Sequence, residues 1–242
     1  MPTFDVRRKD SVSAVSWSEK NGLFTEPRLS GLGLGHGVTH RSLGGMKEKA
    51  NRKAALKACG LSGDVLTLTQ VHGAKVHRAI AALEDDEGDG WVTDTPGRCI
   101  GVFVADCLPI FMWTEDRKAV GVFHCGWRGT AAGMPSEAVS AFKKINRSPN
   151  ELFAAIGPHI GSCCYEVGEE LRDSFSSESF VSGKTLRLDL GSEAARGLMG
   201  AGISADKISV SSDCTACCSD HFFSFRKEKM RSNMLAFIAV PE

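Results

Sequence analysis

Three strongly apolar runs, each of which contains or leads into a histidine or a cysteine, constrain the fold of this chain more than any other feature. The runs are VLTLTQVHG, CIGVFVADCLPIFMW and KAVGVFHCGWRG, and they contain His72, Cys107 and His124. The middle run is too continuous for a half-exposed strand, which indicates burial on both faces. If the ends of these strands meet, two imidazoles and a thiolate lie side by side. Three such ligands suit zinc and leave a fourth position open, which is typical of an enzyme.

Each candidate ligand also has a simpler interpretation. A single histidine after a strand, or a single cysteine beside one, is more often structural than functional. The three residues gain weight because each lies where an apolar run meets a turn, and functional residues collect on such loops. Arg128, in GWRG, adds a cation that can bind phosphate through paired hydrogen bonds, or can pair with a local carboxylate. Asp106 would be that carboxylate, or would orient a ligand imidazole.

The composition excludes several classes of protein. The chain has 242 residues, with 29 Lys and Arg against 29 Asp and Glu. A net charge of zero produces no bulk field that would attract nucleic acid or a membrane surface. No apolar run approaches the ~20 residues of a membrane-spanning helix, and residues 1–11 lack the apolar segment of a signal peptide. We therefore expect a cytoplasmic protein whose nine cysteines are reduced thiols.

The apolar patterns predict strands and helices that intermix without a regular βαβ alternation. The glycine-rich residues 21–45 are expected to form a flexible loop near a site, because GLGLGHG departs from the dinucleotide-binding pattern. The overall prediction is a mixed α/β sandwich in a single domain over residues 1–242. Helices are expected at 47–59, 134–146, 165–177 and 191–200, and strands at 64–71, 99–105, 119–124, 154–161, 208–214, 222–226 and in the final MLAFIAV.

A second group of cysteines leaves a further metal site open. Cys214 and Cys217 have the spacing C-x-x-C, and together with Cys163 and Cys164 they would form a structural zinc site. Two observations count against this interpretation. Adjacent cysteines rarely both bind one metal ion, and the chain has no second C-x-x-C pair.

Several well-known active sites lack their motifs in this chain. Zinc nucleobase deaminases of the usual kind need H-x-E followed by P-C-x-x-C, and neither pattern occurs. Copper oxidases are expected to show H-x-H pairs, which are also absent. The chain contains no G-x-S-x-G and no Walker loop.

Taken together, the motifs resemble those of the YfiH-like family, whose members are also called laccase-domain proteins, multicopper polyphenol oxidoreductases or purine nucleoside phosphorylases. The resemblance spans roughly residues 36–238 and implies an α+β fold, a layered αββα-like sandwich related to the CNF-toxin type of cysteine hydrolase. It also implies a metal site made of His72, Cys107 and His124. The motifs, in family order, are TQVHG (69–73), DGWVT (89–93), ADCLPI (105–110), HCGWRGT (124–130), IGPHIGSCCYEVG (156–168), LDL (188–190), DCT (213–215) and FFSFR (222–226).

The resemblance further implies zinc-dependent phosphorolysis of purine nucleosides, namely adenosine, inosine, guanosine and methylthioadenosine, with adenosine deamination as a second activity. Arg128, Arg41 and Arg226 would bind substrate or phosphate. The segment after HGVTHR (36–41) is shorter than the family pattern, and Arg226 is followed by Lys227-Glu228, which also departs from it. Zinc would polarise an oxygen or lower the pKa of water to about 7.

Three alternative functions remain open at this point. Copper-dependent oxidation of polyphenols is disfavoured by the lack of H-x-H, although thiolate and imidazole ligands also bind copper. A Cys-His hydrolase would use Cys107 as its nucleophile and His124 or His72 as its base. A zinc-dependent binding module would have no turnover. No oligomeric state follows from the sequence.

Overall fold

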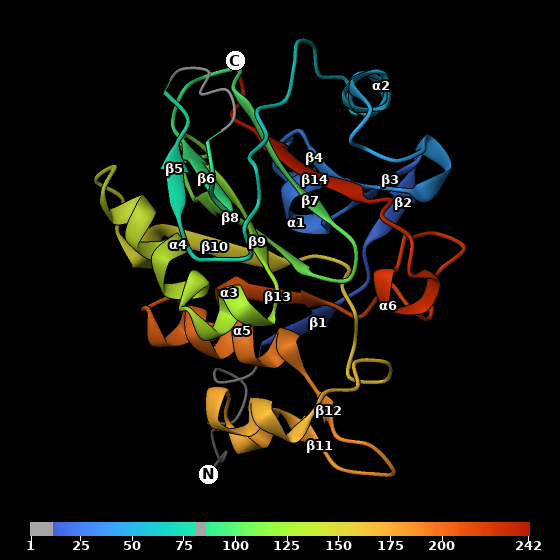
Figure 1. The fold of residues 1–242 in the computed structure, drawn as a ribbon. Helices are drawn as coiled ribbons and strands as arrows, with labels where there is room; N and C mark the ends of the chain where they lie inside the picture. Colours follow the sequence, from blue (N-terminus) through green and yellow to red (C-terminus); the bar gives the residue numbers. More distant parts are fainter. Residues whose placement is uncertain (1–11, 81–85) are drawn as a thin grey trace, which may run out of the picture.

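Two β-sheets packed face to face, with helices on both outer sides, form the core of the structure (Figure 1). The computed structural model describes residues 12–80 and 86–242. Residues 1–11, on which the prediction of no signal peptide rests, lie outside the described residues. The layer order is helices, large sheet, small sheet, helix. This arrangement confirms the predicted αββα-like sandwich.

The larger sheet has seven strands in the order β1-β13-β10-β8-β9-β6-β5. Antiparallel pairing joins β10 to β8, β8 to β9 and β9 to β6, whereas β1, β10 and β13 run parallel, as do β5 and β6. The bounds are β1 (Ser13–Val15), β13 (Ile208–Ser211), β10 (Leu152–Ile156), β8 (Leu108–Thr114), β9 (Val120–Cys125), β6 (Gly90–Thr93) and β5 (Val76–Arg78).

The smaller sheet has five antiparallel strands in the order β2-β3-β4-β14-β7. These are β2 (Ser18–Lys20), β3 (Leu23–Thr25), β4 (His36–Thr39), β14 (Met234–Ala239) and β7 (Cys99–Val104). A separate hairpin pairs β11 (Phe180–Val181) with β12 (Arg187–Leu188).

Helices α3 (Trp127–Ala131), α4 (Met134–Lys143) and α5 (Leu190–Gly200) lie along the large sheet, and α2 (Lys49–Ala58) lies beyond the small one (Figure 1). None of the described helices is both long and apolar enough to cross a membrane. The short elements are α1 (Pro27–Gly31), α6 (Phe225–Glu228), η2 (Arg41–Leu43), η3 (Pro149–Glu151), η4 (Glu169–Ser174), η5 (Ser177–Ser179) and η6 (Ala205–Lys207).

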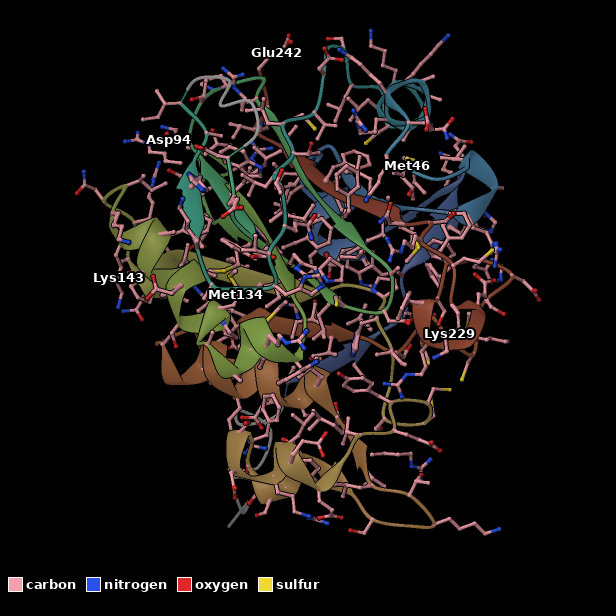
Figure 2. All side chains as sticks on the ribbon, in the orientation of Figure 1. Met46, Asp94, Met134, Lys143, Lys229 and Glu242 are labelled. Atoms are coloured by element: carbon pink, nitrogen blue, oxygen red, sulfur yellow. The ribbon has the colours of Figure 1, made fainter. Side chains whose placement is uncertain are left out.

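Three apolar cores fill the three spaces between the four layers. Strand β14 shows how one strand serves two of them: Met234 and Ala236 face the core between the sheets, and Leu235 faces the core under α2. Because successive side chains of a strand point to opposite faces, a strand covered on both sides is apolar at every position. Figure 2 labels Met46, in the core under α2, and Met134, in the core under α4 and α5. The continuous apolar runs are therefore explained by burial on both faces, as predicted.

The longest apolar run forms two strands, of which the first confirms the strand predicted at 99–105 and the second was not predicted. Its first half is β7 of the small sheet, and its second half is β8 of the large sheet. Between them lies Asp106, whose backbone has a positive φ of 83°. That conformation is rare for a residue other than glycine, and it turns the chain from one sheet to the other. Cys107 follows directly and is the last residue before β8.

Helices α2, α4 and α5 and strands β9, β10, β13 and β14 confirm their sequence predictions with shifted ends, but four other predictions are wrong. Residues 64–71 form only isolated bridges, at Leu66 and Thr69. Most of 165–177 is 3₁₀ or irregular, because the backbone of Tyr165 and Val167 bonds to residues 186–188 instead. FFSFR contains a helix start, since the Ser224 hydroxyl accepts from the backbone N–H of Lys227. Residues 21–45 contain α1, β3, β4 and η2 rather than one flexible loop.

Candidate metal centre

Strands at one end of the large sheet carry the three candidate ligands. His124 is the fifth residue of β9, Cys107 immediately precedes β8, and His72 lies in the turn before β5. Strands β8 and β9 are adjacent, with Leu108 opposite Cys125 and Pro109 opposite His124. Because the two consecutive strands pair antiparallel, Cys107 before β8 lies beside His124 near the end of β9.

His72, Cys107 and His124 converge as the sequence predicts. One side-chain ligand atom from each lies within 4.8 Å of the others. The two imidazole rings stand almost perpendicular, at 88°, with centroids 4.8 Å apart. Gly126 leaves the space that the sulfur needs, because a Cβ there would lie 2.9 Å from the Sγ of Cys107. Two imidazoles and one thiolate at this separation fit a zinc ion that keeps an open position.

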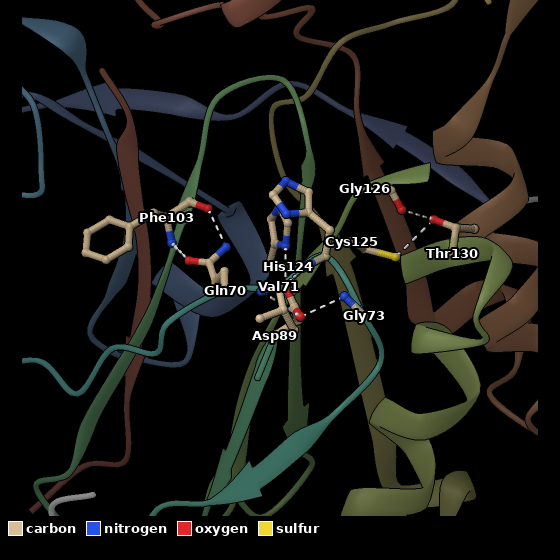
Figure 3. A network of polar contacts seen from close by, with 10 residues as sticks. Gln70, Val71, Gly73, Asp89, Phe103, His124, Cys125, Gly126 and Thr130 are labelled. Carbon is tan, nitrogen blue, oxygen red and sulfur yellow. Dashed lines mark hydrogen bonds and ion pairs between the residues drawn. The ribbon is translucent and has the colours of Figure 1, made fainter. Parts of the chain in front are cut away.

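Asp89 fixes the positions of His124 and of the loop that carries His72 through hydrogen bonds. This role was not predicted from the sequence. The side chain of Asp89 is fully buried and accepts a hydrogen bond of 2.9 Å from Nδ1 of His124 (Figure 3). A carboxylate can only accept, so the proton of His124 is on Nδ1 and Nε2 is free to bind a metal. Asp89 also accepts from the backbone N–H groups of Val71, His72 and Gly73 at 3.3, 2.9 and 2.8 Å. One carboxylate thus positions both imidazoles.

The loop that carries His72 is shaped by side-chain hydrogen bonds rather than by a strand ladder. The amide of Gln70 bonds to both backbone groups of Phe103, with Nε2 to O at 2.9 Å and N to Oε1 at 2.6 Å (Figure 3). His72 itself has a positive φ of 61°, which only a well-supported turn maintains. These bonds explain why residues 64–71 do not form the expected strand.

The Cys107 thiol and the His124 imidazole each shift the pKa of the other toward its charged form. Burial alone would raise the pKa of Cys107, but hydrogen bonds from His124 and His72 and their positive charge outweigh burial and lower the pKa to about 6. Burial alone would lower the pKa of His124, but Asp89 and the Cys107 thiolate raise it to about 9. Without metal, the pair is therefore a thiolate beside an imidazolium at neutral pH.

The reactivity of Cys107 provides a pH-dependent test of this pair. The rate of alkylation by iodoacetamide in chelator-treated protein should rise through about pH 6 and level off above it, because the thiolate is the reacting form. Mass spectrometry of the labelled peptides gives the rate for each cysteine. Cys125 is the internal control, since burial raises its pKa to about 12 and it should stay unlabelled at pH 7. Labelling of Cys107 only above pH 8 would contradict the thiolate assignment.

A cavity of about 740 Å³ opens in front of the three ligands. Its lining is mixed, with apolar side chains, hydroxyls and three cations. The residues that line it besides His72, Cys107 and His124 are Lys47, Arg52, Thr67, Leu68, Thr69, Gln70, Phe103, Ala105, Phe225, Met230, Arg231, Ser232 and Asn233. Two of the cations, Lys47 and Arg52, come from the segment around α2, to which the sequence analysis assigned no site residue.

Comparison with known proteins identifies the family and supports the fold. Residues 17–241 match the family described as multi-copper polyphenol oxidoreductase laccase. This chain belongs to that family. The chain is 32% identical over 196 residues to the purine nucleoside phosphorylase YfiH of Escherichia coli, covering 78% of this chain and 79% of that one. It is 34% identical over 193 residues to the purine nucleoside phosphorylase YlmD of Geobacillus stearothermophilus, covering 70% and 69%.

Solved structures of the family have the same fold. The crystal structure of YlmD from Geobacillus stearothermophilus superimposes with a TM-score of 0.84 at 27% identity, covering 95% of this chain and 100% of that one. The hypothetical protein YfiH of Bacillus licheniformis superimposes with a TM-score of 0.82 at 26% identity, covering 92% and 97%. The laccase-like family fold expected from the motifs is therefore confirmed.

The three arginines predicted for substrate or phosphate do not lie together. Arg41 is engaged away from the cavity, in an ion pair of 2.6 Å with Glu228 and in hydrogen bonds to the carbonyls of Ser219 and Phe222. Arg128 is exposed at the start of α3, with its guanidinium 4.6 Å from the centroid of the Trp127 ring.

Arg226 contacts the ring of Tyr165, and neither Arg226 nor Arg128 is among the residues that line the cavity. The guanidinium of Arg226 is 5.1 Å from the centroid of the Tyr165 ring. Burial raises the pKa of Tyr165 to about 12, the Cys107 thiolate adds to the increase, and Arg226 and Arg128 oppose it. Both arginines therefore act on the pKa of Tyr165 from outside the cavity lining.

Asp106 has neither of the roles expected for it. One carboxylate oxygen accepts from the hydroxyl of Thr215 and the other from the backbone N–H of Arg226, both at 2.6 Å. It joins the β7–β8 turn to the C-terminal loops that carry Arg226. The prediction of a pair with Arg128 or with a ligand imidazole is therefore wrong. It failed because the partners of Asp106 are about 110 to 120 residues away in the chain.

Proposed function

We propose that the chain is a zinc-dependent purine nucleoside phosphorylase, which splits a nucleoside with phosphate into base and ribose 1-phosphate. The observation that carries this proposal is the convergence of His72, Cys107 and His124 on the wall of a cavity of about 740 Å³. Cavities of about 300–1,000 Å³ hold small-molecule ligands, and a nucleoside with phosphate lies within that range. The names of the relatives agree with this choice.

The donor set fits zinc and defines where the ion would bind. His72 and His124 would each give one nitrogen and Cys107 its sulfur, with Asp89 orienting the second histidine. When bound, zinc supplies a Lewis acid that polarises an oxygen in the site. Copper would also accept these ligands, so the metal has to be measured.

The side chains around this site match the charges that phosphorolysis creates. A phosphate oxygen attacks the anomeric carbon of the ribose, and the bond from that carbon to the purine nitrogen breaks, with the electron pair leaving on the base. Arg226, whose guanidinium lies over the Tyr165 ring, and Arg128, which lies over Trp127 at the start of α3, would hold the phosphate through charged hydrogen bonds. Lys47, Arg52 and Arg231 line the cavity and would stabilise negative charge on the departing base.

Aromatic surfaces in the same cavity suit a purine ring. Phe103 and Phe225 both line it, and flat apolar rings bind other rings by offset or edge contacts. Adenosine deamination, in which water replaces the amino group, is the second activity that we propose for this site. It would need no phosphate, so the two reactions are separable by experiment.

Removal of Arg128 tests the proposed phosphate site. Arg128→Ala should raise KM for phosphate by about tenfold or more, because a charged hydrogen bond contributes about 1.5–3 kcal/mol. Initial rates at varied phosphate concentration give this value. Lys118→Ala, an exposed cation in the turn at the other end of β8 and β9, is the matched control and should leave KM unchanged. An unchanged KM in Arg128→Ala would remove this residue from the phosphate site.

The decisive assay incubates the protein with adenosine and phosphate and separates adenine, inosine and ribose phosphate by chromatography. Adenine and ribose phosphate that disappear on chelation, and return with zinc, would support the proposal. Inosine formed without phosphate would support the second activity. Absence of both products, in metal-loaded protein, would contradict the proposal. Phenol oxidation, measured in parallel on protein loaded with copper, tests the oxidase alternative.

A cysteine hydrolase is the second candidate, and one observation favours it. Cys107, His124 and Asp89 form a continuous chain of thiol, imidazole and carboxylate, which is the order found in nucleophilic hydrolases. The two candidates respond oppositely to inhibitors. A hydrolase would survive chelation and lose activity on alkylation of Cys107, whereas a zinc enzyme would lose activity on chelation.

A further inference from the structure

A second cluster of thiols lies outside the site described above. Cys163 and Cys164 lie in the loop after β10, and Cys214 and Cys217 lie in the turn after β13. Their four sulfur atoms lie within 4.8 Å of one another. The Sγ of Cys217 is 3.5 Å from that of Cys163 and 3.4 Å from that of Cys164. The cluster lies at a parallel bridge between His159 and Cys214.

The sulfur separations match those of ligands around one ion. Four sulfurs at about 2.3 Å from a tetrahedral zinc are about 3.8 Å from one another. A disulfide would need two sulfurs at about 2.05 Å. The distances of 3.5 and 3.4 Å lie slightly below the first value and well above the second, and the other separations do not exceed 4.8 Å.

The local backbone explains how two adjacent cysteines both reach the cluster. The N–H groups of Cys164 and Tyr165 both bond to the carbonyl of Gly161, so the chain turns tightly there. Gly161 also permits close approach, because a Cβ on it would lie 3.3 Å from the Sγ of Cys163. Its N–H donates to the Sγ of Cys214 at 3.3 Å. Hydrogen bonds from backbone N–H to sulfur are typical of metal-bound thiolates.

We propose that Cys163, Cys164, Cys214 and Cys217 bind one zinc ion through four sulfurs, in a closed structural site. Four thiolates with no open position are the ligand set of structural rather than catalytic zinc. Each thiol would release its proton to solvent when it binds. Cys163 and Cys217 are exposed, so the ion can enter from solvent.

This zinc would fasten together two loops that support the first site. The loop with Cys214 and Cys217 also carries Thr215, which donates to Asp106. The loop with Cys163 and Cys164 continues to Glu166, whose carbonyl accepts from Nη1 of Arg226 at 2.7 Å. The proposed ion would therefore hold the segments that position Arg226, without contacting substrate.

The test measures zinc content in protein purified in the presence of a reductant and without added metal. To remove the first site from the count, every variant carries Cys107→Ala. Adding Cys163→Ser or Cys217→Ser should lower the zinc content by about one ion per chain, as should Cys214→Ser. Adding Cys218→Ser should not, because Cys218 adjoins Cys217 but packs against the core between the sheets. Cobalt(II) in place of zinc should give thiolate charge-transfer absorption that Cys217→Ser weakens.

Two results would overturn the proposal, whatever the outcome of the nucleoside assay. One is zinc content that is the same in the Cys107→Ala background with and without Cys217→Ser. The other is metal-free protein whose mass shows that the four thiols are lost in pairs, as disulfides. Cys214 is buried and its variant can fail to fold, so the exposed Cys217 and Cys163 are the primary positions, with circular dichroism confirming the fold.

Discussion

Replacement of Cys107 by alanine is expected to abolish metal binding at the His72, Cys107 and His124 site and to end nucleoside phosphorolysis. Loss of an outer partner of a metal ligand already costs about 10- to 100-fold in affinity or activity, so loss of a ligand should exceed about 100-fold. The thiolate is the only anionic ligand of the three, and without it two neutral imidazoles remain beside Asp89.

The measurement combines zinc content with the rate of adenine release from adenosine and phosphate. Cys59→Ala is the matched control, because Cys59 is a partly exposed cysteine at the end of α2, outside both cysteine-containing clusters. It should retain both zinc and activity. Full phosphorolysis by Cys107→Ala would refute the assignment of the site, even if the fold and the family stand.

Asp89→Asn is expected to lower both zinc affinity and turnover by about 10- to 100-fold while the chain still folds. Asparagine has the shape of aspartate but only one oxygen that can accept. Asp89 accepts from four donors, on His124, Val71, His72 and Gly73, and an amide nitrogen in place of either oxygen would face an N–H group. The carboxylate charge that supports His124 is also lost.

A second readout separates positioning from simple loss of stability. Burial raises the pKa of Asp89, but the hydrogen bonds from His124 and Gly73 prevail and hold it below its usual value, so the carboxylate is charged at neutral pH. Without that charge the pKa of His124 should fall, and the alkylation midpoint of Cys107 should move upward from about pH 6. Asp94→Asn is the control, since Asp94 pairs with Arg78 at the surface and should change neither value. An unshifted midpoint in Asp89→Asn would show that Asp89 only supports the fold.

Local sequence patterns were sufficient to predict a mixed α/β sandwich and the three candidate ligands that converge, whereas the αββα-like layering was implied by the family resemblance. Apolar residues at every position of 99–104 and 234–239 require cover on two faces, and only a layered fold provides it. His72, Cys107 and His124 were found because each follows or ends an apolar run at a turn. The motifs around them then identified the family.

The features that sequence missed depend on contacts between distant segments. Nothing local to DGWVT shows that Asp89 receives hydrogen bonds from residues 71–73 and from His124. In the same way, Asp106 accepts hydrogen bonds from residues 215 and 226. The side chain of Gln70 bonds to the backbone of Phe103, where a neighbouring strand would otherwise provide the hydrogen bond. The only local indication of these residues is that they stand in or beside the motifs, and this does not specify their hydrogen-bond partners.

The turn at Asp106 and Cys107 has a mechanical consequence. The sulfur is attached where the chain passes from one sheet to the other, directly before β8, while both imidazoles are anchored through Asp89, directly before β6, at the same end of the large sheet. An ion held by all three would fix the turn between the two sheets to the end of the large sheet. Occupancy of the site would restrict movement of this turn relative to the large sheet, and the shape of the cavity would depend on whether the ion is bound.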